Sequence, residues 1–273
     1  MKYFYEKLDK DDFRIGYKVK QSVYSKKNKD SKIEIIENSL LGKIFILDGF
    51  IHLIEKNEFI FSEMMVHSIM FSHPTPDKVL IISDADRGIL KEVIKHKSIN
   101  EVYLIEENRE AHEALQNNFS NLEVKENSKI KIIYDNSIDY IKNFENYFDV
   151  IIIDTKNPNL RNRDFFKSAF KSLTKEGMVS LFLGDLNDSV SIKENSKLLK
   201  SIFRHSTLLR APSNQILSDS GIILSSKKIN ISEINLRTLI TRFKQFKEAK
   251  NLKYYSPDIH LSSMIIPKFY NIK

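Results

Sequence analysis

The sequence predicts an α/β protein in which a small antiparallel β domain, residues 1–60, precedes a larger doubly wound domain, residues 61–273. Two observations predict this class. From residue 78 onward, short apolar segments alternate with segments of helical periodicity, which is typical of a mainly parallel sheet with helices on both faces. Before residue 60, apolar and polar residues alternate along short segments, as they do in half-exposed antiparallel strands.

The first domain is predicted from its strand and turn signals. The expected strands cover 17–24, 32–37, 42–49 and 50–54. Asp48 and Gly49 separate the last two, and an Asp-Gly pair is a strong signal for a tight hairpin. An apolar helix over 59–71 follows, and it ends before Pro74 and Pro76, which cannot continue a helix.

The second domain is predicted as an alternation of strands and helices. The expected strands cover 79–83, 101–106, 130–134, 150–154 and 178–183, with a further strand over 215–226 near the sheet edge. The expected helices cover 89–96, 109–117, 137–144, 165–173, 191–203 and 231–248. A tail over 252–267 is expected to pack back on this domain.

The segment 78–107 has the layout that an adenosine ligand requires. A buried strand, a polar loop, a helix and a second strand follow one another, and the second strand ends at Glu106. A carboxylate in that place accepts the ribose hydroxyls in nucleotide-binding folds. The loop 83–88 holds one glycine, Gly88, where nucleotide-binding turns carry several. On this segment alone, an ordinary βαβ unit without a ligand is the alternative.

Acids follow the predicted strands of the second domain. They are Asp86, Glu106, Asp135 and Asp154. The carboxyl ends of parallel strands line the ligand crevice in this class of fold. A single aspartate there can simply cap the next helix, but four acids in succession favour a crevice for ribose hydroxyls, an adenine amino group and an ammonium.

Composition excludes several kinds of protein. The chain has no cysteine, which excludes disulfides and thiolate metal sites, and no histidine-carboxylate cluster has the spacing of a metal site. The net charge of +7 comes from scattered lysines, so nucleic acid is not favoured as a partner. No secretory signal peptide and no apolar run long enough to span a membrane is present, which predicts a cytoplasmic protein.

Five segments resemble the polyamine aminopropyltransferase family, which includes spermidine synthase. Leu47-Asp48-Gly49 matches the family's L-D-G hairpin, and residues 57–67 resemble D-E-F-x-Y-H-E-M-L-x-H. Residues 73–82 resemble H-P-x-P-K-x-V-L-I-I, and residues 150–158 resemble V-I-I-x-D-x-x-D-P. Residues 252–260 resemble L-K-Y-Y-N-x-E-x-H. These segments occur in the family's order along the chain.

The resemblance implies a fold, a reaction and partners. The second domain would be a Rossmann-like sheet of the S-adenosylmethionine-dependent methyltransferase type. The enzyme would move an aminopropyl group from decarboxylated S-adenosylmethionine, a co-substrate, to an amine such as putrescine. No tightly bound cofactor and no metal is implied. The protein would be a homodimer, with the apolar N-terminal hairpin contributing to its interface.

The resemblance also implies roles for individual residues. Asp154 would orient and deprotonate the attacking amine. The adenosyl ligand would contact Asp86 at its aminopropyl end, Glu106 at the ribose, Asp135 and Asn136 at the adenine, and His52. The amine substrate would contact Phe61, Glu63, Asn157 and Gln215. For His52, a surface side chain is the alternative, and for His67 a local pair with Glu63 is expected from their i, i+4 spacing.

The departures from the family pattern lie in the expected site. The loop G-G-G-D-G-G of the family reads S-D-A-D-R-G at 83–88, and its second acid of D-x-x-D-P is Asn157 here. Phe61 and Ser62 replace a tyrosine and a histidine, and the loop 155–163 is basic. Two alternatives therefore stay open: a weak or inactive homologue that acts as a binding partner, and an enzyme that uses another adenosyl sulfonium.

Overall fold

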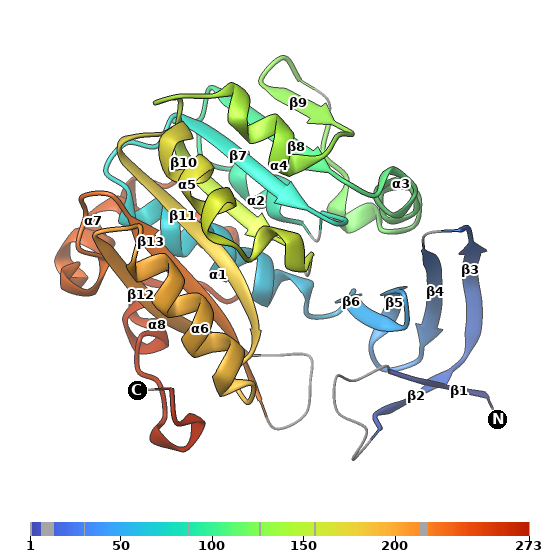
Figure 1. Cartoon of the computed structure of the whole chain (residues 1–273). Coiled ribbons are helices and arrows are strands. Elements are labelled where there is room, and N and C mark those ends of the chain that lie inside the picture. The colour runs from blue at the N-terminus through green and yellow to red at the C-terminus, as the bar shows by residue number, and fades with distance from the viewer. Residues whose placement is uncertain are drawn as a thin grey trace. The chain divides into compact units, whose positions relative to one another are not determined.

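The computed structural model describes residues 2–6, 14–29, 31–86, 88–125, 127–155, 157–212 and 218–272. The chain forms two compact units, which are drawn in Figure 1. Unit 1 consists of Met1–Glu58 and Asn108–Glu123, and unit 2 of Phe59–Glu107 and Val124–Lys273. No helix of the described residues is long and apolar enough to cross a membrane.

Unit 1 contains two antiparallel sheets. β1 (Lys2–Tyr5) pairs with β2 (Gly16–Val19), and β3 (Gln21–Lys27), β4 (Lys32–Asn38), β5 (Gly42–Leu47) and β6 (Phe50–Ile54) pair in sequence order. The predicted hairpin is confirmed, because Leu47 lies opposite Phe50 and only Asp48 and Gly49 connect them. Both have positive φ, at 54° and 88°, which is the conformation that this two-residue turn requires.

The helix α3 (Arg109–Asn118) and the turn η1 (Ser120–Leu122) group with unit 1, although the sequence analysis assigned residues 108–123 to the second domain. The ring of Phe119 packs edge-on against Phe45 at 6.5 Å. Lys43 Nζ donates to the carbonyl oxygen of Asn118 at 2.5 Å. These contacts join residues about 75 positions apart, which a reading based on sequence order does not detect.

Unit 2 is built on a seven-stranded sheet with the order β12-β13-β11-β10-β7-β8-β9. The strands are β7 (Lys78–Ser83), β8 (Glu101–Glu106), β9 (Ile130–Ile133), β10 (Phe148–Asp154), β11 (Leu173–Asp185), β12 (His205–Pro212) and β13 (Asp219–Ser226). β9, β8, β7, β10 and β11 are parallel, whereas β13 is antiparallel to both of its neighbours. The strand order reverses between β7 and β10, where ligands bind in open α/β sheets.

Helices connect and cover these strands (Figure 1). They are α1 (Glu58–Ser72), α2 (Ile89–Val93), α4 (Ser137–Tyr140), α5 (Arg163–Ser172), α6 (Ser189–Lys200), α7 (Leu236–Gln245) and α8 (Pro257–Ser263). The predicted helix over 231–248 is shorter, because a 3₁₀ turn, η4 (Ile231–Glu233), precedes α7. The strand predicted over 215–226 near the sheet edge is confirmed as β13, which lies next to the edge strand β12, and the sequence did not predict β12.

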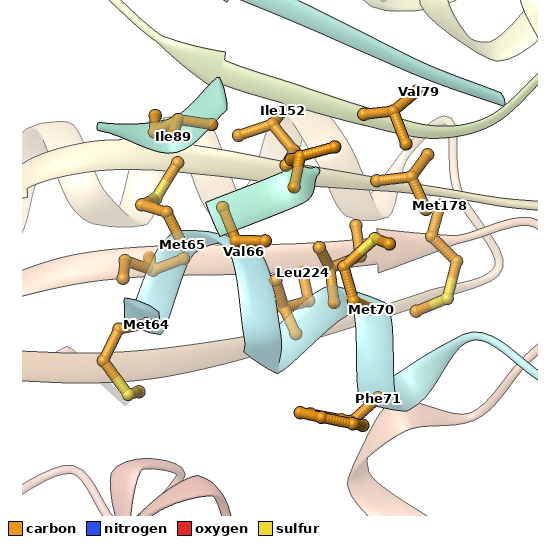
Figure 2. Close-up of a cluster of buried hydrophobic side chains, with 14 of the residues drawn as sticks. Met64, Met65, Val66, Met70, Phe71, Val79, Ile89, Ile152, Met178 and Leu224 are labelled. Atoms are coloured by element: carbon orange, nitrogen blue, oxygen red, sulfur yellow. The ribbon is translucent and has the colours of Figure 1, made fainter. Parts of the chain in front are cut away.

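Two hydrophobic cores lie on opposite faces of the sheet. Alternate residues of β7 divide between them, with Val79 and Ile81 in one and Leu80 and Ile82 in the other. The first core includes side chains of α1, α2 and α7, and Figure 2 shows Met65, Met70 and other α1 residues beside strand residues such as Ile152. The second includes side chains of α5 and α6. Burial on both faces explains why β7 reads as an unbroken apolar run.

Candidate functional site

The loop after β7 carries Asp86, which is hydrogen-bonded to the start of α2 and to the end of β8. Asp86 is 1% exposed, and its Oδ1 accepts hydrogen bonds from the backbone nitrogens of Ile89, at 2.8 Å, and Leu90, at 3.2 Å. Its own backbone nitrogen donates to Glu106 Oε1 at 2.8 Å. Gly88, with φ 94°, makes the left-handed turn into α2. One glycine is therefore enough to shape this end of the loop, and Asp86 ties it to both α2 and β8.

Glu106 ends β8 and is fully buried. Burial raises the pKa of Glu106 well above its ordinary range, and the charges of Asp86, Asp84 and Asp154 act in the same direction. The backbone hydrogen bond from Asp86 opposes this shift. A buried carboxylate among other carboxylates is costly, and such strained groups are concentrated at binding and catalytic sites.

Asp154 ends β10 directly beside the end of β7, where its Cα pairs with that of Ser83. It is 5% exposed. The following residue, Thr155, donates its hydroxyl to Asp84 Oδ1 at 2.5 Å. Asp154 thus lies at the switch point of the strand order, on the same edge of the sheet as Asp86 and Glu106.

The loop after Asp154 is anchored on the adjoining loops. Asn157 Nδ2 donates to Glu107 Oε2 at 2.9 Å. The other oxygen of Glu107 accepts from the backbone nitrogen and the hydroxyl of Ser137, at 3.1 and 2.5 Å. Asn157 also accepts a bond from the backbone nitrogen of Asn159 at the start of η3 (Pro158–Leu160). The sequence does not predict a role for Glu107, because nothing in its local pattern distinguishes it from a solvent-exposed acid.

Asp135 and Asn136 lie on the segment between β9 and α4, and both are exposed. Asp135 Oδ1 accepts from the backbone nitrogen of Asn136 at 2.7 Å. Asn136 caps α4, since its side-chain oxygen accepts from Asp139 N at 3.1 Å. The neighbouring Ser137 bonds to Glu107, so this segment is connected to the loop that carries Asn157.

The remaining predicted site residues do not lie on the loops that follow β7, β8 and β10. Both carboxylate oxygens of Glu63 accept backbone N–H groups, from Lys253, Tyr254 and Tyr255 at 2.8–2.9 Å, so Glu63 anchors the C-terminal tail. Phe61 packs edge-on against Phe182, with ring centroids 5.1 Å apart. His52 belongs to unit 1, where its ring faces Phe45 at 6.4 Å. Gln215 lies outside the described residues.

The predicted pair of His67 with Glu63 is wrong. His67 is fully buried, and its Nε2 bonds to Glu92 Oε2 at 3.0 Å while its Nδ1 bonds to His96 Nε2 at 2.8 Å. Glu63 is instead occupied by the backbone of the tail. Glu63 and His67 do lie one turn apart on a helix, as their spacing predicts. However, Glu92 and His96 bind His67, and the backbone of the tail binds Glu63. In the described part of the chain, no group of three or more histidines and acids could hold a metal ion.

The sequence matches two family descriptions. Residues 58–209 match the Spermine/spermidine synthase domain, and residues 3–55 match the Spermidine synthase tetramerisation domain. The polyamine aminopropyltransferase of Hydrogenobaculum sp. (strain Y04AAS1) is 30% identical over 98% of this chain and 95% of that protein. That of Buchnera aphidicola subsp. Schizaphis graminum (strain Sg) is also 30% identical, over 98% and 96%.

Solved structures agree with these matches. A crystal structure of spermidine synthase in complex with the transition-state analogue AdoDATO has a TM-score of 0.91 at 28% identity, covering 98% of this chain and 92% of that one. The spermidine synthase of Thermotoga maritima has a TM-score of 0.89 at 28% identity, with the same coverage. The chain therefore belongs to the spermine/spermidine synthase family of polyamine aminopropyltransferases. The predicted fold, with its methyltransferase-type sheet, is confirmed.

Proposed function

We propose that this protein transfers the aminopropyl group of decarboxylated S-adenosylmethionine to an amine, either putrescine, which would yield spermidine, or a related amine. The observation that carries this proposal is the gathering of Asp86, Glu106 and Asp154 at the switch point of the sheet. Family membership supplies the reaction class. The relative crystallised with AdoDATO supports an adenosyl ligand of this kind.

In the proposed reaction, the lone pair of the amine attacks the carbon bonded to the sulfonium sulfur. The carbon–nitrogen bond forms as the carbon–sulfur bond breaks, and the electron pair of that bond leaves with sulfur as neutral methylthioadenosine. The attacking amine loses one proton, which Asp154 accepts. An alkylamine is mostly protonated at pH 7 and the nucleophile is the free base, so a carboxylate must accept a proton. Because the leaving group is neutral, alignment of the two substrates supplies much of the rate.

The same proposal assigns the binding roles. Glu106 accepts the two ribose hydroxyls, Asp135 and Asn136 contact the adenine, and Asp86 contacts the aminopropyl end. His52, Phe61 and Asn157 are assigned to the substrates on family resemblance. The contacts of Glu63 with the tail support an anchoring role more than a direct contact with the amine. A role for Gln215 stays a prediction.

The test is release of methylthioadenosine from decarboxylated S-adenosylmethionine with a panel of amines. Asp154→Asn should lower kcat at least about 100-fold, the lower range for losing a general base, while methylthioadenosine still binds. Asp164→Asn, an exposed acid in the first turn of α5, is the matched control and should change kcat little. If no amine yields methylthioadenosine, or if Asp154→Asn stays active, the proposed reaction is wrong.

We also propose that the protein is a cytoplasmic homo-oligomer, with the homodimer as its smallest form. The match of residues 3–55 to a domain described by tetramerisation supports association through unit 1. Tyr3 and Tyr5 on β1 are 45% and 58% exposed, which gives this unit apolar surface to bury. Light scattering that gives 32.0 kDa, the mass of one chain, at micromolar concentration would exclude association.

A further inference from the structure

Arg161 is held across the ends of two neighbouring strands. It follows η3 in the loop after β10. Its Nη2 donates to the carbonyl oxygens of Thr155, at 2.9 Å, and Phe182, at 2.6 Å. These carbonyls belong to the segment after β10 and to the last part of β11. The guanidinium therefore lies at the same edge of the sheet as Asp154.

The second terminal nitrogen of this guanidinium forms no hydrogen bond within the described part of the chain. Nη1 is buried and has no hydrogen-bond partner among the described residues. Burial lowers the pKa of Arg161 to about 10, and Asp154 and Asp84 act in the opposite direction, so the side chain is charged at pH 7. A buried charged donor without a partner costs more free energy than a neutral one. Such a donor is suited to an anionic ligand group.

The loop that carries Arg161 supplies no carboxylate for a second ammonium. The rings of Phe61 and Phe182 meet at 5.1 Å, and Phe182 supplies one of the carbonyls that hold Arg161. The side-chain nitrogen of Asn157 is bonded to Glu107. The loop 155–163 contains no acid. The second ammonium of a dication such as putrescine would therefore meet the guanidinium of Arg161 and no acid of this loop.

We infer that the amine substrate also carries a carboxylate, which Arg161 binds while Asp154 receives the attacking nitrogen. This inference rests on the proposed aminopropyl transfer. Asp154 for the amine nitrogen and Arg161 for the carboxylate together match a zwitterionic amine, as an amino acid with a side-chain amine would be. The bond from Nη1 to a carboxylate is charge-assisted, which makes it stronger than a neutral hydrogen bond.

Putrescine and ornithine are the matched probes, since ornithine is putrescine with one added carboxylate. We expect wild type to release methylthioadenosine with a higher kcat/KM for ornithine than for putrescine. Arg161→Gln should lower the ornithine value roughly 10- to 150-fold, the effect of one bond to a charged group, and leave the putrescine value equal or higher. Arg163→Gln is the control, because Arg163 is an exposed residue of the same charge that donates to Ser201 Oγ at 3.2 Å. It should change neither value.

Arg161→Lys and the melting temperature of each variant separate a loss of recognition from a loss of folding. Wild type that uses putrescine but not ornithine, or an Arg161→Gln variant that folds and loses both equally, overturns the inference. If no amine yields methylthioadenosine, the proposed transfer fails, and titration calorimetry of ornithine into protein saturated with methylthioadenosine decides the inference. Binding to wild type that Arg161→Gln abolishes supports it, and no binding to wild type overturns it.

Discussion

Glu106 and Glu92 are two buried glutamates of unit 2, and their surroundings shift their pKa values in opposite directions. Both are at most 1% exposed, so burial acts similarly on each. Burial by itself would raise the pKa of Glu92, but its bonds with His67 and Lys95 outweigh this and lower it. The pKa of Glu106 is raised by burial and further by the charges of Asp86, Asp84 and Asp154.

This difference separates a charge that stabilises the fold from one that would bind a ligand in the proposed function. Around Glu92, the chain supplies partners of opposite charge or complementary bonding, with Lys95 Nζ at 2.5 Å and His67 Nε2 at 3.0 Å. Around Glu106, several carboxylates gather at one edge of the sheet. Like charges held together in a buried place destabilise the free protein, and the cationic, hydroxyl-bearing co-substrate of the proposed function would offset that penalty.

The largest effect on stability is expected at Glu92. Glu92→Gln leaves Lys95 and the buried His67 without their carboxylate partner, and breaking a buried pair costs about 3–5 kcal/mol. The lowered pKa means that the contribution of Glu92 is present above its unfolded pKa of about 4.3. This contribution is lost as the pH falls through the lower pKa of the folded state.

Urea unfolding of wild type and Glu92→Gln at pH 7 and at acid pH measures the difference in their free energies of unfolding. This difference should be full at pH 7 and should shrink in acid. Glu113→Gln is the control, because Glu113 forms an exposed i, i+4 pair with Arg109 at 2.8 Å. Its loss should cost less than about 0.5 kcal/mol. Equal costs for the two variants would show that burial and pairing at Glu92 contribute nothing.

A smaller effect of opposite sign is expected at Glu106. Its raised pKa means that its contribution to stability is full below the unfolded pKa and is lost as the pH rises through the folded pKa. Glu106→Gln should therefore be more stable than wild type at pH 8 in the absence of ligand. The same variant should bind methylthioadenosine less tightly by about 1.5–3 kcal/mol, because the ribose hydroxyls lose a charged partner.

Thermal unfolding and titration calorimetry measure the two halves of this prediction. Wild type should also bind the ligand more tightly as the pH rises, because binding favours the carboxylate form of Glu106. A variant with unchanged affinity would remove Glu106 from the ribose site. A variant that binds weakly but gains no stability would mean that the free protein does not bear the penalty we infer from its surroundings.

The smallest effect concerns Asn157 and Glu107. Asn157→Asp restores the acid of the family pattern but places it against Glu107, whose oxygen is 2.9 Å from Asn157 Nδ2. We expect the single variant to lose about 1 kcal/mol of stability, a typical net value for one hydrogen bond, with no gain in putrescine turnover. Adding Glu107→Gln exchanges the amide and the carboxylate between the two positions. The double variant should regain the lost stability and raise putrescine turnover.

A double-mutant cycle on the melting temperature and on the KM for putrescine measures the coupling. If Asn157→Asp alone is as stable as wild type and lowers this KM as much as the double variant does, Glu107 does not constrain the loop.

The fold could be predicted from the sequence because its signals are local. The apolar run at 79–82 and the Asp48-Gly49 turn depend on neighbouring residues, and both occur in the structure as predicted. The gathering of acids after the strands was also predictable. In a parallel sheet the acids that follow successive strands must meet at one edge, so Glu106 and Asp154 lie at the same end of adjacent strands.

The partners of the buried polar side chains could not be predicted in this way. His67 bonds to residues 25 and 29 positions away, Asn157 to Glu107 across 50 positions, and Arg161 to Phe182 across 21. The strand order β9-β8-β7-β10-β11 determines which loops and helices lie side by side, and therefore which polar groups can meet. Where several donors reach one carboxylate, they compete for it. Periodicity along the chain reports which face a residue occupies. Only the folded arrangement determines which polar group it meets there. Leaving a buried polar group unpaired costs free energy, so the tertiary structure selects partners that can bond to it.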